Sequence, residues 1–254
     1  MDFTEKYTAD KEGRLLLRKI NDMINISERT FSAVYSVFLD PAQQALAGSV
    51  AEFFGNITMV GGYDDAERRL CRACTDEYAS DEGAPIVLFT AESTMKEAEI
   101  SHRDVLGSLM GLGIKREMVG DILTNGARPQ FFCHSSVADF IEFNLERIGR
   151  YTVKIKRTES AELYEQKYEI KKINVSSMRL DCICAETFGI SRTKAAEMIR
   201  AGLVFVNWLE KRDPSFEVKS GDKISLRGKG KAEVSDVTGT SRKGRLFVEV
   251  KKKV

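Results

Sequence analysis

The sequence predicts an α+β protein in three parts, and three observations support this prediction. Apolar residues recur at helical spacing near the N-terminus and are followed by a short strand-like run. The middle of the chain alternates between strand and helix patterns. The last third combines two short helical patterns with a hairpin pattern. We therefore expect domains at residues 1–80, 81–165 and 171–254, the last with a basic C-terminal tail. The charged, weakly patterned residues 158–172 are the expected connector.

The first eighty residues predict an α-rich α/β domain. A helix is expected over residues 12–26, because apolar side chains such as Leu16, Ile20 and Met23 fall on one helical face. A second helix is expected from residue 30 to residue 39, where Asp40-Pro41 would stop it, and another from residue 64 to residue 78. A strand is expected at residues 57–60. Nothing in this part indicates chemistry.

The middle part follows the pattern β-α-β-β-α-β. Its expected elements cover, in order, residues 85–89, 103–112, 119–123, 130–133, 137–148 and 151–155. This order is that of the ferredoxin-like sandwich, which RNA-recognition (RRM-like) modules and many other proteins share. Phe131 and Phe132 are the only candidates for stacking on bases from this sheet. Because neighbouring strand residues face opposite sides, one of the two must point into the core.

The C-terminal part predicts two small helices packed against a hairpin-like sheet. The first helix has an apolar stripe that includes Leu180, Ile183 and Phe188, and it should close at Gly189. Ser191 is the expected N-cap of the second helix. Strands are expected at residues 203–206 and 223–226.

The charges are distributed unevenly, although the formal net charge is only +1. Residues 171–254 hold 19 Lys and Arg against 10 Asp and Glu, while residues 1–170 hold 20 against 28. A basic half beside an acidic half is a signal for binding of nucleic acid or another anionic surface. The basic residues that lie off the apolar stripes or flank the strands are Arg179, Arg192, Lys194, Arg200, Lys211, Arg212, Lys223, Arg227, Lys229 and Lys231. They suit phosphates, but they are equally compatible with solvated faces of small helices.

A resemblance to known families favours RNA binding over solvated helix faces. The stretches "RLDCICAETFGISRTKAAEMIRAGLVFVNW" and "VKSGDKISL" resemble the RNA-binding domain named after small-ribosomal-subunit protein four. The stretch "SHRDVLGSLMGLGIKREMVGDI" resembles the YlmH family of bacterial proteins, in which such a domain follows an N-terminal and a ferredoxin-like domain. The resemblance implies a non-enzymatic factor that binds ribosomal and transfer RNA on the large ribosomal subunit. It also implies a role in tail elongation on stalled nascent chains, in ribosome-associated quality control, and a link to cell division attaches to the family.

The family's RNA-facing positions correspond to seven residues of this chain: Arg179, Asp181, Ser191, Arg192, Lys194, Arg200 and Asn207. Lys211, one of the basic residues that flank the strands, is the eighth candidate. Asp181 is expected to orient a basic neighbour, since a carboxylate and a phosphate repel each other. Trp208 stands where the broader domain pattern has glycine after asparagine, and a two-residue hairpin turn favours glycine there. Trp208 could stack on a base or cap the small core, and we favour the core.

The sequence does not support a metal site or a catalytic site. Cys71 and Cys74 form a C-x-x-C within a helical pattern, with no second pair or histidine nearby, so buried cysteines are favoured over zinc ligands. His102 is expected to make a hydrogen bond at the start of a helix, and His134 is the only other histidine. We expect no catalytic residues, no metal and no cofactor.

The sequence also predicts the cellular compartment of the protein and its functional class. The odd number of scattered cysteines favours reduced thiols in a cytoplasm, and no apolar run is long enough for a membrane span. We expect a cytoplasmic monomer that binds RNA. The alternative from another class is an RNA-modifying enzyme, such as a pseudouridine synthase, which would use the C-terminal domain for docking.

Overall fold

The structure is a computed structural model that describes residues 8, 10–54, 57–74, 83–95, 97–124, 126–163, 168–241 and 244–253. The chain divides into two compact units, residues 1–164 and 165–254. The first unit thus includes both of the ranges for which two separate domains are predicted, and the division into three domains stays a prediction. In the described part of the chain, no helix is long and apolar enough to cross a membrane.

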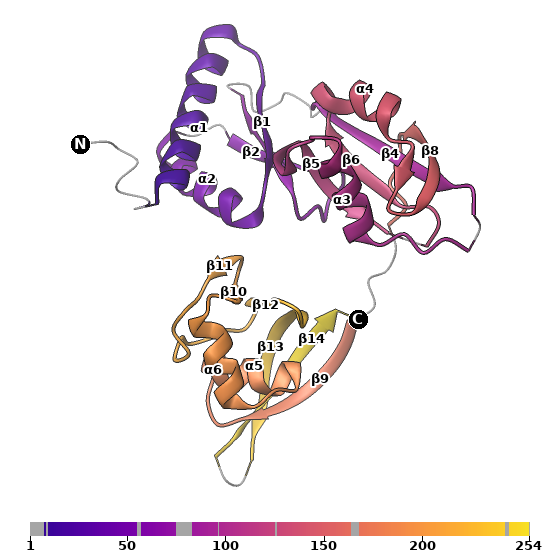
Figure 1. The fold of residues 1–254 in the computed structure, drawn as a ribbon. Helices are drawn as coiled ribbons and strands as arrows, with labels where there is room; N and C mark the ends of the chain where they lie inside the picture. The colour runs from indigo at the N-terminus through magenta and orange to yellow at the C-terminus, as the bar shows by residue number, and fades with distance from the viewer. Residues whose placement is uncertain are drawn as a thin grey trace. The chain divides into compact units, whose positions relative to one another are not determined.

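The first unit begins with two helices that cover a small sheet (Figure 1). Helix α1 (Lys11–Thr30) starts at Asp10, whose side chain accepts a hydrogen bond from the Gly13 amide at 2.9 Å. Helix α2 (Pro41–Phe54) starts at Asp40, which exchanges backbone and side-chain hydrogen bonds with Gln43, both at 2.9 Å. Strands β1 (Val34–Leu39), β2 (Ile57–Val60) and β3 (Arg69–Ala73) pair antiparallel in the order β1-β3-β2.

The helix at residues 12–26 and the strand at 57–60 are confirmed, but two expected helices are wrong. Residues 34–39 form β1, because their β-branched and aromatic side chains favour a strand once Phe31, at φ 51°, has ended α1. Residues 69–73 form β3, the central strand, in which four consecutive residues are buried. A fully buried run shows no alternation, so periodicity does not separate it from a helix. Residues 75–78 of that expected helix lie outside the described residues.

The second sheet of this unit has the predicted order of elements. Strand β4 (Ile86–Ser93) is followed by α3 (His102–Gly111), the short helix η2 (Arg116–Met118), β5 (Val119–Leu123), β6 (Gln130–His134), α4 (Ser135–Asn144), β7 (Arg147–Ile148) and β8 (Tyr151–Thr158). The strand order is β5-β6-β4-β8-β7, and all pairs are antiparallel. The helix expected to reach residue 148 ends at Asn144, and Arg147–Ile148 instead pairs with the start of β8.

The two sheets of the first unit share a hydrophobic core. Phe38 and Leu70 from the small sheet pack against Leu88 and Phe132 from the larger sheet. The ring of Tyr63 stacks on that of Phe132, with centroids 5.7 Å apart. The face of the larger sheet that lies opposite α3 and α4 is therefore covered at Phe132 by the N-terminal segment.

Polar contacts strengthen this junction. The Arg68 guanidinium donates to the carbonyl oxygens of Val119 at 3.0 Å and Phe38 at 2.9 Å. The Asp121 carboxylate accepts hydrogen bonds from the Tyr63 hydroxyl at 2.8 Å and from two backbone amides of the loop at residues 67 and 68. Burial and the nearby Asp121 charge raise the pKa of Tyr63, which keeps the phenol protonated as the donor.

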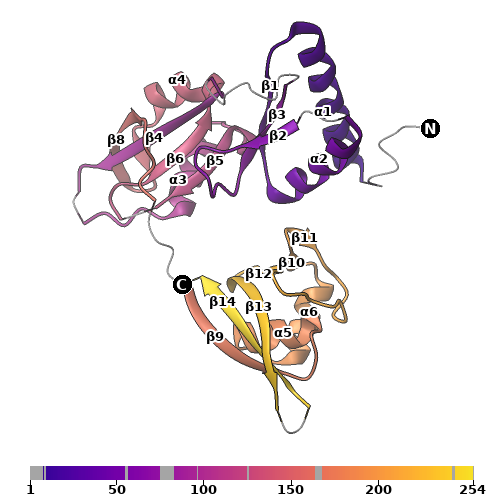
Figure 2. The same cartoon turned by 180° about the vertical axis from the view of Figure 1, so that it is seen from behind.

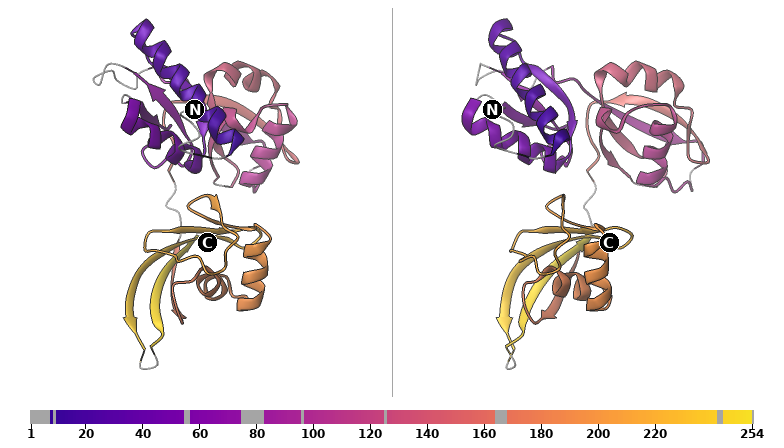
Figure 3. Two further views of the ribbon diagram at one scale, coloured as in Figure 1. Left: turned by 90° about the vertical axis from the view of Figure 1, so that its left-hand side faces the viewer. Right: turned by 60° about the vertical axis from the view of Figure 1, so that its left-hand side comes forward.

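The second unit places two short helices on one side of a larger sheet (Figures 2 and 3). Helices α5 (Leu180–Phe188) and α6 (Arg192–Arg200) follow β9 (Tyr168–Val175). Strands β10 (Val204–Val206), β11 (Leu209–Glu210), β12 (Lys223–Leu226), β13 (Gly230–Thr240) and β14 (Leu246–Lys253) complete the sheet, in the order β11-β10-β12-β13-β14-β9. The basic residues 251–253, expected to lie in a tail, belong to β14, which pairs with β9 and β13 within this sheet.

Candidate RNA-binding face

The starts of α5 and α6 bring three of the predicted residues together: Arg179, Asp181 and Arg192. Arg179 is the N-cap residue of α5, and Asp181 lies in its first turn. Gly189, at φ 64°, ends α5 in the left-handed conformation that glycine adopts without strain. The chain then turns directly into α6, where Ser191 accepts a hydrogen bond from the Lys194 amide at 3.2 Å and Arg192 is the first helical residue. This short connection brings Arg192 beside Asp181.

Asp181 holds two arginines by hydrogen bonds. Its side chain is only 6% exposed, and it accepts from Arg179 Nε and Nη2, both at 3.2 Å, and from Arg192 Nε at 3.0 Å. The arginine side chains are 41% and 55% exposed. We call Arg179 and Arg192, as held by Asp181, the arginine pair. A buried carboxylate thus fixes two guanidinium groups at the surface.

The ionisation of Asp181 follows from two opposing effects. Burial acts to raise the pKa of Asp181, but the hydrogen bonds from Arg179 and Arg192 outweigh it, and the pKa lies below its usual value of 3.8. The same contact raises the pKa of Arg179. Asp181 is therefore a carboxylate at neutral pH, and it positions the two arginine side chains that it binds.

The other predicted residues do not all join this pair. Lys194 is exposed and forms an ion pair with Glu197 at 3.1 Å. Arg200 is exposed in the last turn of α6, about 12 Å from Arg192 along the helix axis. Lys211 lies on the strand side, with its ammonium 4.6 Å from the centre of the Phe216 ring. Ser191 is occupied by its role as N-cap.

Asn207 and Trp208 form the hairpin tip, which does close into a two-residue turn. Both have positive φ, 48° and 64°, and Val206 pairs with Leu209 across the turn. Asn207 donates to the Asp222 carboxylate at 2.7 Å and accepts from the Lys223 amide at 2.9 Å, so it holds the turn together. The expectation that Trp208 caps the core is wrong: it lies outside the core of this unit, partly exposed, with the Lys223 ammonium 5.4 Å from its ring centre.

Three aromatic–cation contacts described for this unit were not predicted from the sequence. Besides Lys211 with Phe216 and Lys223 with Trp208, the Arg227 guanidinium lies 5.5 Å from the centre of the Phe205 ring. The signal in the sequence was the alternation of Lys223, Ser225 and Arg227 with buried aliphatic residues along β12.

The candidates in the first unit do not form a site. Phe131 and Phe132 are 0% and 3% exposed, so neither can stack on a base. Cys71 lies in β3 rather than in a helix, and burial raises its pKa to about 11. His134 caps α4 by accepting from the Ser136 amide at 3.2 Å. His102 is the first residue of α3, whose N-cap is Ser101. Within the described ranges, no cluster of His, Cys, Asp and Glu could hold a metal ion.

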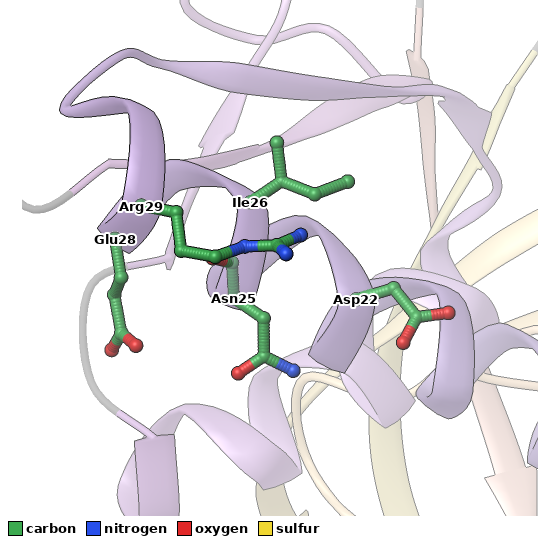
Figure 4. Close-up of a pocket in the computed structure, with 5 residues that line it drawn as sticks. All are labelled: Asp22, Asn25, Ile26, Glu28 and Arg29. Carbon is green, nitrogen blue, oxygen red and sulfur yellow. The ribbon is translucent and has the colours of Figure 1, made fainter.

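A hollow beside α1 also lacks the features of a ligand site (Figure 4). It is lined by Asp22, Asn25, Ile26, Glu28 and Arg29, which all come from the exposed face of this one helix. The side chains carry both signs of charge and, as Figure 4 shows, do not converge on a common point.

Comparisons with known proteins agree with this geometry. Residues 80–162 match a family model described as "Putative RNA-binding domain in YlmH", and residues 178–224 match the S4 domain. The chain is 32% identical over 244 residues to the ribosome-associated protein quality control protein P2 of Bacillus subtilis (strain 168), and the alignment covers 94% of each chain. The solved structure of the cell division protein ylmH from Streptococcus pneumoniae is 23% identical, covers 59% of this chain and 93% of its own, and superposes with a TM-score of 0.50, which shows a shared fold. The identity to the Bacillus protein over nearly the whole chain, together with both domain matches, shows that this chain belongs to the YlmH family.

Proposed function

We propose that this protein is a non-enzymatic RNA-binding factor that docks on the large ribosomal subunit, where it contacts ribosomal and transfer RNA. Its role is to support C-terminal tailing of stalled nascent chains in ribosome-associated quality control, as a cytoplasmic monomer. The name of the Bacillus subtilis relative supports the ribosomal setting, and the two matched domain models support RNA as the partner.

The observation that carries the proposal is the arginine pair. A guanidinium donates in a planar fork that fits two phosphate oxygens, and fixing it beforehand lowers the entropy lost on binding. Asp181 fixes two such groups beside each other at the start of α6, where the helix dipole also favours an anion. Within the described part of the chain, the bond to Asp181 uses only Nε of Arg192, which leaves its terminal nitrogens for a phosphate.

The residues around the arginine pair favour contacts with the RNA backbone over recognition of individual bases. Lys194 and Arg200 extend the positive charge along α6, and both are exposed. Charge of this kind recognises the shape and the phosphates of structured RNA rather than a base sequence. Ribosomal RNA, which is highly structured, suits this mode of binding.

Sedimentation with purified large ribosomal subunits tests the proposal. We expect the wild-type chain to pellet with the subunits and Arg192→Ala to remain largely in the supernatant. Arg29→Ala serves as the matched control, because Arg29 is an exposed arginine on α1, outside both matched domains. If Arg192→Ala and Arg29→Ala pellet equally well, the arginine pair is not the docking face.

A second measurement separates this function from RNA modification. The protein is incubated with a labelled transcript, and the uridines are then analysed for isomerisation. We expect none, since the proposed role requires binding only. Conversion of uridine would replace the proposal with an enzymatic one.

A further inference from the structure

We propose that the outer face of the C-terminal sheet is a second RNA-contact surface, at which Trp208 and Phe205 stack on unpaired bases. We call Phe205, Trp208, Lys223 and Arg227 the aromatic face. These residues come from β10, the turn after it and β12 with its end, whereas the arginine pair comes from α5 and α6. The inference goes beyond the docking role, because it names unpaired nucleotides as the ligand of a separate surface.

Strand alternation places these side chains on the side of the sheet away from the helices. Ile224 is buried in the core that α5 and α6 share with the sheet, so its neighbours Lys223 and Ser225 point to the opposite face. Phe205 pairs in register with Ser225 and points the same way. The outer position of Trp208 follows from its contact with Lys223. Helices α5 and α6 lie together on the other side of this sheet (Figure 3).

Each ring of the aromatic face is paired with one cation. The Lys223 ammonium lies 5.4 Å from the centre of the Trp208 ring, and the Arg227 guanidinium lies 5.5 Å from that of Phe205. Both cations are exposed, so they can turn toward solvent when a ligand approaches. An unpaired nucleotide needs the same two partners: a flat apolar ring for its base and a cation for its phosphate.

The backbone of Trp208 gives an independent reason to expect a ligand. A bulky side chain at φ 64° is a conformational outlier, and glycine would form this turn without strain. The ring does not belong to the core of the unit, so burial does not account for its presence there. The ring is partly exposed on the outer side of the sheet, where a base can reach it.

The charges near the aromatic face favour RNA over a protein partner. Lys223, Arg227, Lys229 and Lys231 are exposed around it. The acidic side chains nearby include Glu210, which binds Arg212 at 2.5 Å, and Glu233, which faces Lys223 across the strands. Asp222 is also near, and it accepts hydrogen bonds from the Asn207 side chain and the Lys219 amide. An acidic protein segment would match the positive charge, but RNA supplies both a negative charge and a flat ring with every nucleotide.

Fluorescence gives a direct test, because Trp208 is the only tryptophan of the chain. A short oligouridylate, which does not pair with itself, is titrated into the full-length protein. We expect saturable quenching of the tryptophan emission as bases stack on the ring, and we expect Arg192→Ala to keep this quenching. An unchanged spectrum with oligouridylate would overturn the proposal, as would quenching by polyglutamate alone, which would indicate an acidic protein partner.

Variants at position 208 separate a ligand role from a structural role. Binding of labelled oligouridylate is followed by anisotropy, and Trp208→Gly should weaken it by about tenfold, since one stacked base is lost. Its Tm should be unchanged or higher, because glycine relieves the strained turn. Trp208→Tyr should keep most of the affinity. Phe31→Leu is the matched control, as Phe31 is an aromatic residue at the end of α1 that is 85% exposed and lies outside both matched domains.

Two outcomes of this variant series would contradict the proposal. Wild-type affinity in Trp208→Gly would remove the ring from the RNA contact, and a lower Tm would show that the ring holds the hairpin. Failure of the aromatic-face proposal can be told apart from failure of the docking proposal, because docking is measured by the pelleting of Arg192→Ala with large subunits. If Trp208→Gly loses oligouridylate binding while Arg192→Ala still pellets with large subunits, the aromatic face is supported and the docking role of the arginine pair is contradicted.

Discussion

Arg192 Nε lies 3.0 Å from Oδ2 of Asp181, a residue eleven positions earlier in the chain. This bond joins the starts of α5 and α6, and the same carboxylate also binds Arg179. Because Asp181 is buried and both arginines are exposed, one side chain links the stability of the unit to the geometry of its basic face.

The first prediction concerns Asp181→Asn, which keeps the shape of the side chain and removes its charge. Two arginines then lose a charged acceptor, and we expect the free energy of unfolding to fall by about 1–3 kcal/mol. RNA affinity should fall as well, although no cation is removed. Urea unfolding and filter binding of a structured RNA measure the two effects. Wild-type RNA affinity in this variant would show that the arginines do not depend on Asp181 for their positions.

The second prediction concerns pH. The pKa of Asp181 is lowered in the folded protein, so the folded state binds its proton less readily than the unfolded chain does. Its stabilising contribution is therefore complete above the unfolded value of 3.8 and is lost as the pH falls through the lower folded value. The difference in unfolding free energy between wild type and Asp181→Asn should be constant near neutral pH and shrink below about pH 4. A difference that grows on acidification would contradict this assignment.

The third prediction concerns Arg192→Ala and salt. If Arg192 neutralises one phosphate, its removal should reduce the slope of log affinity against log salt concentration by about 0.7–0.9. Binding to different structured RNAs should weaken by similar factors. Exposure alone would predict no loss of stability, but Asp181 loses one of its two partners, so a modest decrease in Tm is expected. An unchanged salt slope would remove Arg192 from the RNA face.

Sequence reasoning was most successful where periodicity is strong. Helix α1 and the β-α-β-β-α-β order follow from side-chain spacing, which local geometry imposes directly. It failed at β1 and β3, because the burial of β3 on both faces depends on elements far away in the sequence. The burial of Phe132 against the N-terminal segment could not be predicted for the same reason, since its partners Phe38 and Leu70 come from another sheet.

Within the candidate site, residue types were easier to predict than roles. Arg179 and Arg192 could be chosen because they are cations off the apolar stripes, and the orienting role of Asp181 was expected from charge repulsion. The bonds that occupy Asn207 could not be anticipated, because its partners Asp222 and Lys223 lie where β12 begins, a strand that the chain reaches only later. The exposure of Trp208 depends on the same pairing of β10 with β12.

The last prediction tests the junction within the first unit through two glycines. A Cβ added at Gly62 would lie 2.1 Å from the Phe132 ring, which is buried and stacked on Tyr63 and therefore has little room to move. Gly62→Ala should thus lower the free energy of unfolding by about 1–3 kcal/mol, measured in urea. Gly107→Ala is the matched control: Gly107 lies within α3, a Cβ there meets nothing within 4 Å, and alanine should stabilise the helix by about 0.5–1 kcal/mol. Equal effects of the two substitutions would mean that Phe132 is not held against the N-terminal segment, and the sheet face around it would then be open to ligands.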